Sequence, residues 1–310
     1  MYVLFLVFNV ALCITFIGVP YQGIMNQFNC LLRAAMLCKI ANITLSIPPF
    51  VTEDVNGNSL YLSPKIFFDI DKMFKGISHA QLKDISVISH MASPLILHGR
   101  WKNRSMLGKQ ALMFINSYLS TRFVDEFHNN ITVYSRVREF LEVLKSTQGN
   151  YIAAGNLQHT LLGKDALPLL ERIKFSTFFK RFIKAAKIQS NFTKTYTTVH
   201  WRRGDFEKAC RKNKNYTKCF PSVHMINKIA KYSTVLVATN EKNQTSLKIL
   251  DEMSHILQKF HFTEMDPVTS LLFDFYFMID ASQFIGNSYS TISRNVASIR
   301  QFLGKPTDFF

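Results

Sequence analysis

The chain has 310 residues, of which 47% are hydrophobic and 19% charged, and its formal net charge is +16. This composition is typical of a folded globular protein and excludes an intrinsically disordered one. The length suits one large or two medium domains. The basic residues occur in short scattered clusters, and none of these has the interleaved aromatic pattern of an RNA-binding sheet. This distribution argues against nucleic acid as a partner and leaves an anionic membrane or acidic substrates open.

The N-terminal run 1–19 is almost wholly apolar and contains no Lys or Arg. It is about long enough to anchor a chain in a membrane. Its second half, 14–18, also has the character of a buried strand that leads into a glycine turn. We therefore expect a short or truncated signal or anchor segment at 1–11, followed by the first core strand.

A strand–helix–strand unit, the seed of a parallel sheet, follows in the first 50 residues. Its parts are a turn at 21–27, a helix at 28–40 and a strand at 43–47 that Pro48 and Pro49 end. The middle of the chain mixes amphipathic helices, such as 110–124, with short strands, such as 151–154.

The alternation of helices and strands is clearer from residue 166 onward. The predicted elements are a helix at 168–188, a strand at 196–201, a helix at 222–232, a strand at 234–239, a helix at 245–260, a strand near 261–263, a helix at 268–280, and a segment at 284–291 that enters a final helix. The sequence therefore predicts two Rossmann-like domains, 12–165 and 166–310, with a central cleft.

The strand 196–201 delivers strongly polar residues to its end, where open α/β sheets bind ligands. Alternation along the strand sends His200 and Arg202 to one side, so both can reach the same anion. The guanidinium of Arg202 suits phosphate oxygens, Asp205 can hold one guanidinium in place, and Gly204 permits the turn.

Three further segments at strand ends are candidate ligand sites: 23–26, Thr239-Asn240, and 286–291. In the last of these, Ser290 and Thr291 precede a helix whose amide groups attract anions. Their hydroxyl groups suit either of two roles, capping that helix or binding phosphate oxygens. Together with Arg202 these groups could hold a diphosphate without a metal ion.

Glycosylation sequons and cysteines favour the secretory pathway. Six sequons occur where chance gives about three, at Asn42, Asn103, Asn130, Asn191, Asn215 and Asn243. In an oxidising compartment Cys210 and Cys219 could close a small loop. Cys30 and Cys38 lie about 12 Å apart along a predicted helix, which is too far for a disulfide.

Colinear blocks of the chain resemble the GDP-fucose protein O-fucosyltransferases, and most of all the type 1 enzymes that act on EGF-like repeats. The blocks cover about half of the chain and are 23–27, 41–50, 200–210, 219–221, 237–240, 273–276, 284–291 and 304–310. Each block is only moderately specific, and their shared order makes the resemblance strong.

The resemblance implies an inverting GT-B glycosyltransferase that needs no metal ion or other cofactor. Its partners would be GDP-fucose and an acceptor protein with EGF-like repeats, in the lumen of the endoplasmic reticulum or, alternatively, the Golgi. Asn26 and Arg202 would be catalytic. The residues that would bind GDP-fucose are Gly23, Ile24, Met25, Asn26, His200, Trp201, Arg202, Asp205, Asn240, Ser290, Thr291 and Ile292.

Departures from the type 1 pattern leave alternatives open. Gly23 replaces an arginine, and Met25 replaces a glycine. The form Arg202-Arg203-Gly204-Asp205 is nearer to other branches, including enzymes that fucosylate sugars. The alternatives are therefore a carbohydrate-directed fucosyltransferase and a non-catalytic relative that binds a nucleotide sugar. A third is a metal-dependent transferase that uses the D-x-D triplet at 69–71.

Overall fold

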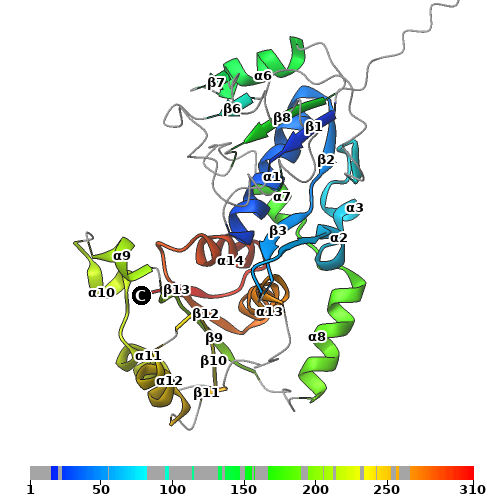
Figure 1. The fold of residues 1–310 in the computed structure, drawn as a ribbon. Helices are drawn as coiled ribbons and strands as arrows, with labels where there is room; N and C mark the ends of the chain where they lie inside the picture. The colour runs from blue at the N-terminus through cyan, green and yellow to red at the C-terminus, as the bar shows by residue number, and fades with distance from the viewer. Residues whose placement is uncertain are drawn as a thin grey trace, which may run out of the picture. The chain divides into compact units, whose positions relative to one another are not determined.

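The computed structural model describes residues 15–19, 23–54, 56–81, 95–97, 114, 132–134, 137–146, 151–155, 157, 167–189, 195–204, 206–211, 214–230, 234–241, 243–252, 256–257 and 266–310. The chain divides into two compact units, each with its own parallel sheet (Figure 1). One comprises Met1–Thr52, Ser59–Pro64 and Ile70–Leu169, and the other Glu53–Asn58, Lys65–Asp69 and Leu170–Phe310. The expected α/β class is confirmed, and the expected central cleft stays a prediction.

The first unit contains a sheet of six strands in the order β5-β2-β1-β8-β6-β7, in which every pairing is parallel. The strands are β1 (Thr15–Gly18), β2 (Thr44–Ile47), β5 (His79–Gln81), β6 (Leu95–Leu97), β7 (Thr132–Tyr134) and β8 (Tyr151–Gly155). The other elements of this part of the chain are α1 (Ile24–Ala41), β3 (Phe50–Glu53), β4 (Ser59–Leu62), α2 (Pro64–Phe67), α3 (Ile70–Met73), α6 (Val137–Ser146) and α7 (Leu167–Glu171). Strands β3 and β4 form a separate two-stranded sheet.

The predicted strand–helix–strand unit at the N-terminal end is confirmed as β1, α1 and β2. Helix α1 begins at Ile24, four residues earlier than predicted, because the backbone N–H groups of Asn26 and Gln27 both donate to the carbonyl oxygen of Gly23. Residues 24–27 are therefore the first helical turn and not a loop. The predicted helix at 110–124 and the segment 1–11 lie outside the described residues, apart from Phe114.

The second unit contains five parallel strands in the order β11-β10-β9-β12-β13. They are β9 (Thr197–Trp201), β10 (Val235–Thr239), β11 (Ile256–Leu257), β12 (Gln283–Gly286) and β13 (Thr307–Phe309). The helices are α8 (Thr177–Gln189), α9 (Phe206–Cys210), α10 (Tyr216–Cys219), α11 (Val223–Ala230), α12 (Gln244–Asp251), α13 (Pro267–Asp280) and α14 (Thr291–Phe302).

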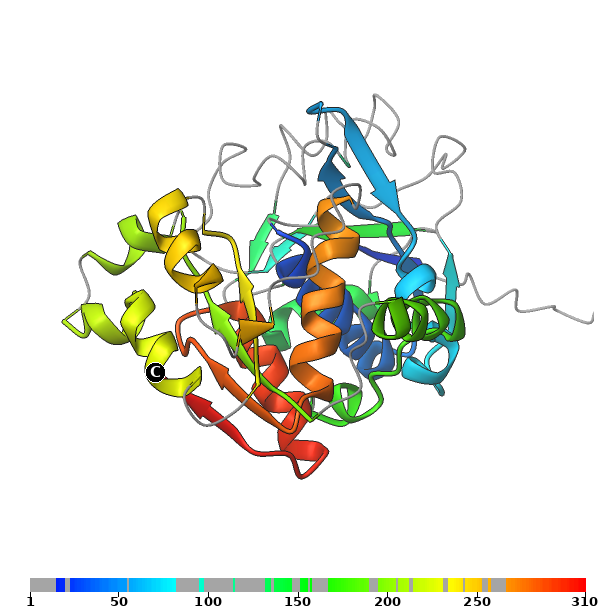
Figure 2. The same cartoon turned by 90° about the horizontal axis from the view of Figure 1, so that it is seen from below.

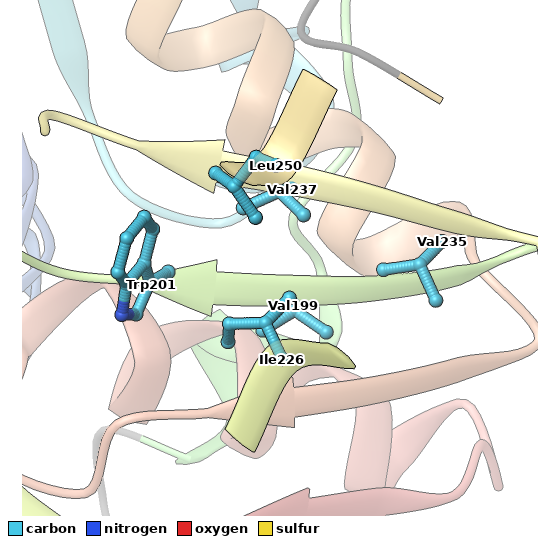
Figure 3. Packing of buried hydrophobic residues seen from close by; sticks show 6 residues of the cluster. All are labelled: Val199, Trp201, Ile226, Val235, Val237 and Leu250. Carbon is cyan, nitrogen blue, oxygen red and sulfur yellow. The ribbon is translucent and has the colours of Figure 1, made fainter. Parts of the chain in front are cut away.

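One face of this sheet packs on α11 and α12 (Figure 3). Its core there is a cluster of Val199, Trp201, Ile226, Val235, Val237 and Leu250, all of which are buried. Helices α13 and α14 lie on the other side of the sheet (Figure 2). Burial on both faces agrees with β9, in which every residue is buried, and with β10, which reads as an almost continuous apolar run.

Two predicted helices of this unit are wrong in extent. The predicted helix 168–188 is two helices, because residues between them pair with a distant segment: the N–H of Ser176 donates to Phe67, and that of Asp69 donates to Lys174. The predicted helix 245–260 ends with α12, and Ile256 and Leu257 instead extend the sheet as β11. The strand predicted near 261–263 lies outside the described residues.

None of the described helices has both the length and the apolar character that a membrane span requires. The longest described helix, α1, instead buries apolar side chains within the first unit. It packs closely on β1, since a Cβ atom at Gly18 would lie 2.9 Å from the Cβ atom of Ala34.

Candidate functional site

An open pocket of about 260 Å³ lies at the carboxyl ends of β9 and β10 in the second unit. Its lining residues come from these strands, the turns that follow them and helices α13 and α14: His200, Arg202, Ala238, Thr239, Asn240, Ser270, Leu271, Asp274, Met278 and Ile292. Ala238 pairs with His200 in parallel register, so both strands end at the same edge of the sheet. The pocket therefore brings five of the predicted site residues together: His200, Arg202, Thr239, Asn240 and Ile292.

Strand alternation in β9 has the predicted effect. His200 and Arg202 line the pocket, whereas Val199 and Trp201 point to the core on the opposite face (Figure 3). Trp201 is fully buried, and its Nε1–H donates to the carbonyl oxygen of Pro221 over 2.8 Å. The side chain of Trp201, which we expected at the ligand, therefore lies away from the pocket.

The imidazole of His200 is 5% exposed. It forms a hydrogen bond with Ser293, with 2.7 Å between Nδ1 and the serine Oγ. Burial, and secondarily the positive charge of Arg202, lowers the pKa of His200 from 6.5 to about 3. The ring is therefore neutral at neutral pH, and it can offer a ligand one hydrogen bond without adding a charge.

The two adjacent arginines have different surroundings. Arg203 forms an ion pair with Glu241, with 2.6 Å between Nε and Oε2, and its guanidinium stacks 3.6 Å from the ring centroid of Phe220. It also donates to the carbonyl oxygen of Pro221. Arg203 therefore holds the turn after β9 in place. Arg202 lines the pocket, so it is the arginine that this turn presents to a ligand.

Glycine is required at position 204 by both conformation and space. Its φ is +60°, and a Cβ atom there would lie 2.9 Å from Nδ2 of Asn240. The Oδ1 atom of Asn240 accepts a 2.8 Å hydrogen bond from the N–H of Arg203. The turn after β9 is thus packed against the end of β10. Asp205, expected to hold a guanidinium, lies outside the described residues.

The turn between β12 and α14 lies at the same edge of the sheet. Ser290 occupies the N-cap position of α14, but its side chain makes no capping hydrogen bond. Ile292 in the first helical turn lines the pocket, so the positive end of the helix dipole is beside it. Of the two roles left open for Ser290, the structure does not show capping. Thr291 is the first helical residue and is partly buried.

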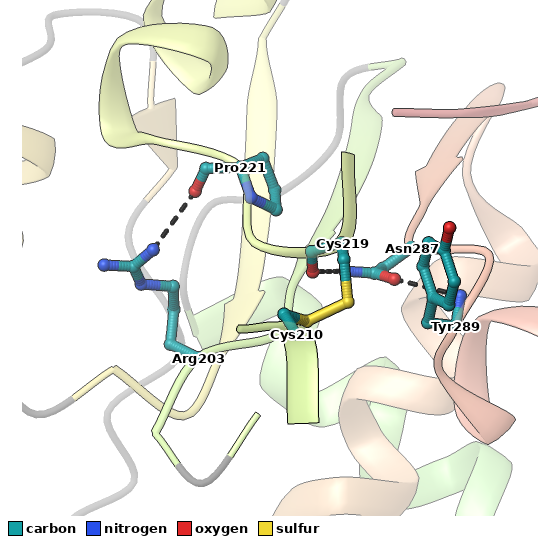
Figure 4. Close-up of a disulfide and its surroundings, with 6 residues drawn as sticks. All are labelled: Arg203, Cys210, Cys219, Pro221, Asn287 and Tyr289. Carbon is teal, nitrogen blue, oxygen red and sulfur yellow. Dashed lines mark hydrogen bonds between the residues drawn. A yellow bond between two sulfur atoms is a disulfide. The ribbon is translucent and has the colours of Figure 1, made fainter. Parts of the chain in front are cut away.

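The predicted disulfide between Cys210 and Cys219 is confirmed (Figure 4). It joins the short helices α9 and α10, which follow the arginine turn. The fully buried side chain of Asn287 donates from Nδ2 to the carbonyl oxygen of Cys219 over 2.6 Å. The disulfide segment is therefore attached to the turn before α14.

The remaining predicted residues lie in the first unit, at the start of α1. Ile24 and Met25 are buried there, Asn26 is half-buried, and Gly23 is the exposed N-cap residue. The roles expected for these four residues stay predictions.

Three polar residues of the site were not predicted from the sequence: Ser270 and Asp274, which line the pocket from α13, and Ser293, which forms a hydrogen bond with His200. A signal for the first two was present. They lie four residues apart, on one face of an otherwise strongly apolar helix. No feature of the sequence indicated that Ser293 would bond to His200, which lies 93 residues earlier in the chain.

The D-x-D triplet has a local explanation, since Asp71 in α3 accepts a hydrogen bond of 3.0 Å from His79. Within the described part of the chain, no group of three or more His, Cys, Asp or Glu side chains could hold a metal ion. Three sequon residues, Asn42, Asn215 and Asn243, are exposed. The other three, Asn103, Asn130 and Asn191, lie outside the described residues.

Comparison with known proteins finds likeness only at the level of structure. No protein-family model and no curated protein matches the sequence. The apo form of POFUT1 shares 14% sequence identity and superposes with a TM-score of 0.71, covering 96% of this chain and 98% of that one. POFUT1 in complex with GDP-fucose shares 15%, with a TM-score of 0.69 and coverage of 96% and 97%. The fucosyltransferase NodZ from Bradyrhizobium shares 15%, with a TM-score of 0.47 and coverage of 91% of both chains.

The fold and the pocket define an α/β protein with two parallel-sheet units and a pocket with charged and apolar lining residues at the carboxyl edge of the second sheet. More particularly, the chain has the fold of POFUT1, which is GDP-fucose protein O-fucosyltransferase 1. The expected resemblance to the type 1 enzymes is thereby confirmed at the level of the fold.

Proposed function

We propose that this protein is a fucosyltransferase that uses GDP-fucose as its donor, on a GT-B fold. One observation carries the proposal: His200, Arg202 and Asp274 line one pocket at the carboxyl edge of a parallel sheet. This pocket occurs in a chain with the fold of POFUT1, for which complexes with GDP and with GDP-fucose are among the solved structures.

The diphosphate would bind at the end of the pocket that Arg202 and the start of α14 supply. In glycosyl transfer the bond between the anomeric carbon and the phosphate oxygen breaks, and negative charge accumulates on the leaving GDP. A guanidinium and a helix N-terminus already in place stabilise that charge without a metal ion. The proton of the acceptor hydroxyl would pass to the leaving phosphate, so no carboxylate base is needed.

The guanine base would bind on the α13 side of the pocket. Its Watson–Crick edge carries two neighbouring donors, N1–H and the N2 amino group, which match the two oxygens of the Asp274 carboxylate. Leu271 and Met278 offer apolar surface to the flat faces of the base. A uracil base has only one N–H on that edge, so this carboxylate favours GDP over UDP.

The acceptor we propose is a Ser or Thr hydroxyl of a folded protein domain of the EGF-like type, with inversion at the sugar carbon. The colinear resemblance to the type 1 enzymes over about half of the chain supports this acceptor, and it assigns Asn26 a catalytic role at the fucose and acceptor hydroxyl. The disulfide and the exposed sequon residues support a compartment of the secretory pathway, with the endoplasmic reticulum first.

The test is to incubate the full chain with GDP-fucose and three separate acceptors: a folded EGF-like repeat, a reduced and unfolded form of that repeat, and a free oligosaccharide. Intact mass spectrometry detects a fucose adduct, and GDP release gives the rate. We expect an adduct on the folded repeat alone. Transfer to the oligosaccharide alone would assign a carbohydrate-directed enzyme. GDP-fucose binding without transfer to any acceptor would assign a non-catalytic relative.

A donor series checks the base contact separately. We expect GDP to bind at least tenfold more tightly than UDP, and Asp274→Asn to reduce that preference because the amide presents a donor to the guanine N–H groups. Equal binding of GDP and UDP by the unaltered protein would contradict the role assigned to Asp274.

A further inference from the structure

Three buried groups behind the pocket form a chain of hydrogen bonds. The backbone N–H of Asn287 donates to Oγ of Ser293 over 2.9 Å. The same Oγ lies 2.7 Å from Nδ1 of His200. Ser293 and Asn287 are both fully buried, so water does not compete for these bonds.

The direction of the second bond follows from the first. Because the serine oxygen already accepts from Asn287, its own proton is the one available for Nδ1 of His200. Imidazole that accepts at Nδ1 carries its single proton on Nε2 when it is neutral. The opposite arrangement, with a proton on Nδ1, would leave the hydroxyl proton of Ser293 to find another acceptor in a buried setting.

The other ring nitrogen, Nε2, faces a different environment. His200 is 5% exposed and lines the pocket, and no described residue forms a hydrogen bond with its Nε2. Among the described residues, Nε2 is not one of the fully buried atoms that lack a partner, so it is accessible from the pocket, and a ligand there is the partner that this nitrogen can reach.

We propose that Ser293 is a positioning residue that fixes His200 as the neutral Nε2–H form and aims that N–H into the pocket as a donor for an anionic oxygen. Arg202 supplies positive charge in the same pocket, and Asp274 supplies the one carboxylate among its lining residues. A second positive charge on His200 would be repelled by Arg202 and is costly at this depth. A neutral donor avoids both penalties.

The assignment of the ligand oxygen to the diphosphate of GDP rests on the proposed function, whereas the tautomer of His200 does not. The test therefore begins on the full chain without ligand. Selective ¹⁵N labelling of histidine, with the His200 signals identified by their loss in His200→Gln, shows which ring nitrogen carries the proton. We expect the proton on Nε2 from pH 6 to pH 8. A proton on Nδ1, or a charged ring in this range, would overturn the proposal.

The second measurement compares Ser293→Ala with Ser298→Ala. Both serines are in α14, but Ser298 donates only to the carbonyl oxygen of Arg294 one turn back. We expect Ser293→Ala to give a mixture of tautomers at His200 and to weaken GDP binding roughly three- to tenfold, while Ser298→Ala changes neither. An unchanged His200 spectrum in Ser293→Ala would refute the positioning role. An altered spectrum in a protein that does not bind GDP would preserve that role and refute the proposed function.

Discussion

The side-chain amide of Asn287 donates a hydrogen bond of 2.6 Å to the carbonyl oxygen of Cys219, and this bond connects the disulfide to the turn before α14 (Figure 4). The same side chain accepts from the N–H of Tyr289 through Oδ1. The disulfide segment and the turn at the start of α14 are therefore joined by hydrogen bonds through one side chain. Because Ile292 of α14 lines the pocket, we expect changes in this connection to alter ligand binding.

Replacement of Asn287 by alanine should destabilise the protein by about 2 to 4 kcal/mol, because the buried carbonyl oxygen of Cys219 and the partly buried N–H of Tyr289 both lose their partner. We also expect weaker GDP binding. Denaturant unfolding and calorimetry measure the two effects. The control is Asn58→Ala, which removes an exposed amide from a surface turn. Equal stability of the two variants would mean that the buried connection is unimportant.

Arg202→Ala should reduce fucose transfer by about two orders of magnitude or more without loss of the fold, because the leaving diphosphate loses its neighbouring positive charge. The matched control is Arg138→Ala, which removes an exposed arginine from α6. The readout is the rate of GDP release with a saturating acceptor, together with the circular dichroism spectrum. Near-normal turnover in a folded Arg202→Ala protein would disprove the assigned role.

Asn26→Ala should reduce turnover more than GDP binding, since we assign Asn26 to the fucose and the acceptor hydroxyl. Its backbone N–H bonds to Gly23, and that bond is kept in the variant. Turnover and GDP affinity are measured on the same preparation. If both fall by the same factor, Asn26 has a structural role in the first turn of α1.

Arg300→Met should cost about 3 kcal/mol or more in the free energy of unfolding. Arg300 is fully buried, and its guanidinium donates to the backbone carbonyl oxygens of Met278, Ile279, Ala281, Ser282 and Pro306. Methionine fills similar volume but satisfies none of these carbonyl groups. Arg294→Met, an exposed position of the same helix, is the control. Urea midpoints of both variants test the difference.

Acid should destabilise the protein in part through His200. Burial and Arg202 lower its pKa to about 3, whereas an unfolded chain takes up the proton near pH 6.5. Between these pH values protons bind the unfolded chain preferentially. The contribution of His200 to the free energy of unfolding is therefore complete above pH 6.5 and falls as the pH decreases toward 3. Below pH 6 the stability of the unaltered protein should therefore fall more steeply, by up to ~1.4 kcal/mol per pH unit, than that of His200→Gln.

Chemical unfolding at a series of pH values provides this comparison, with His224→Gln, an exposed histidine of α11, as the control. The control should retain the steep dependence of the unaltered protein. If His200→Gln and the unaltered protein lose stability in parallel on acidification, His200 does not titrate as described.

Local patterns predicted much of the second unit. Thr197–Trp201 is rich in β-branched and aromatic residues, Val235–Thr239 is an apolar run, and both fold as buried strands. The placement of His200 and Arg202 on one side of the chain followed from the two-residue repeat of a strand and is confirmed by the pocket.

The errors arose where a distant contact overrides local preference. The helical pattern at 168–188 is interrupted because Ser176 caps α8, accepting from the N–H of Phe179, while its own N–H bonds to Phe67. Ile256 and Leu257 leave a helical pattern because they complete the sheet beside Val235 and Leu236. Neither partner is near in sequence, so periodicity alone could not indicate these breaks.

A crystal structure of the full chain with bound GDP tests the central claim most directly. The account predicts the diphosphate within hydrogen-bonding distance of the Arg202 guanidinium and of Nε2 of His200, with the guanine edge on the carboxylate of Asp274. GDP bound elsewhere on the protein, or an absence of GDP binding in calorimetry with the same preparation, would contradict it.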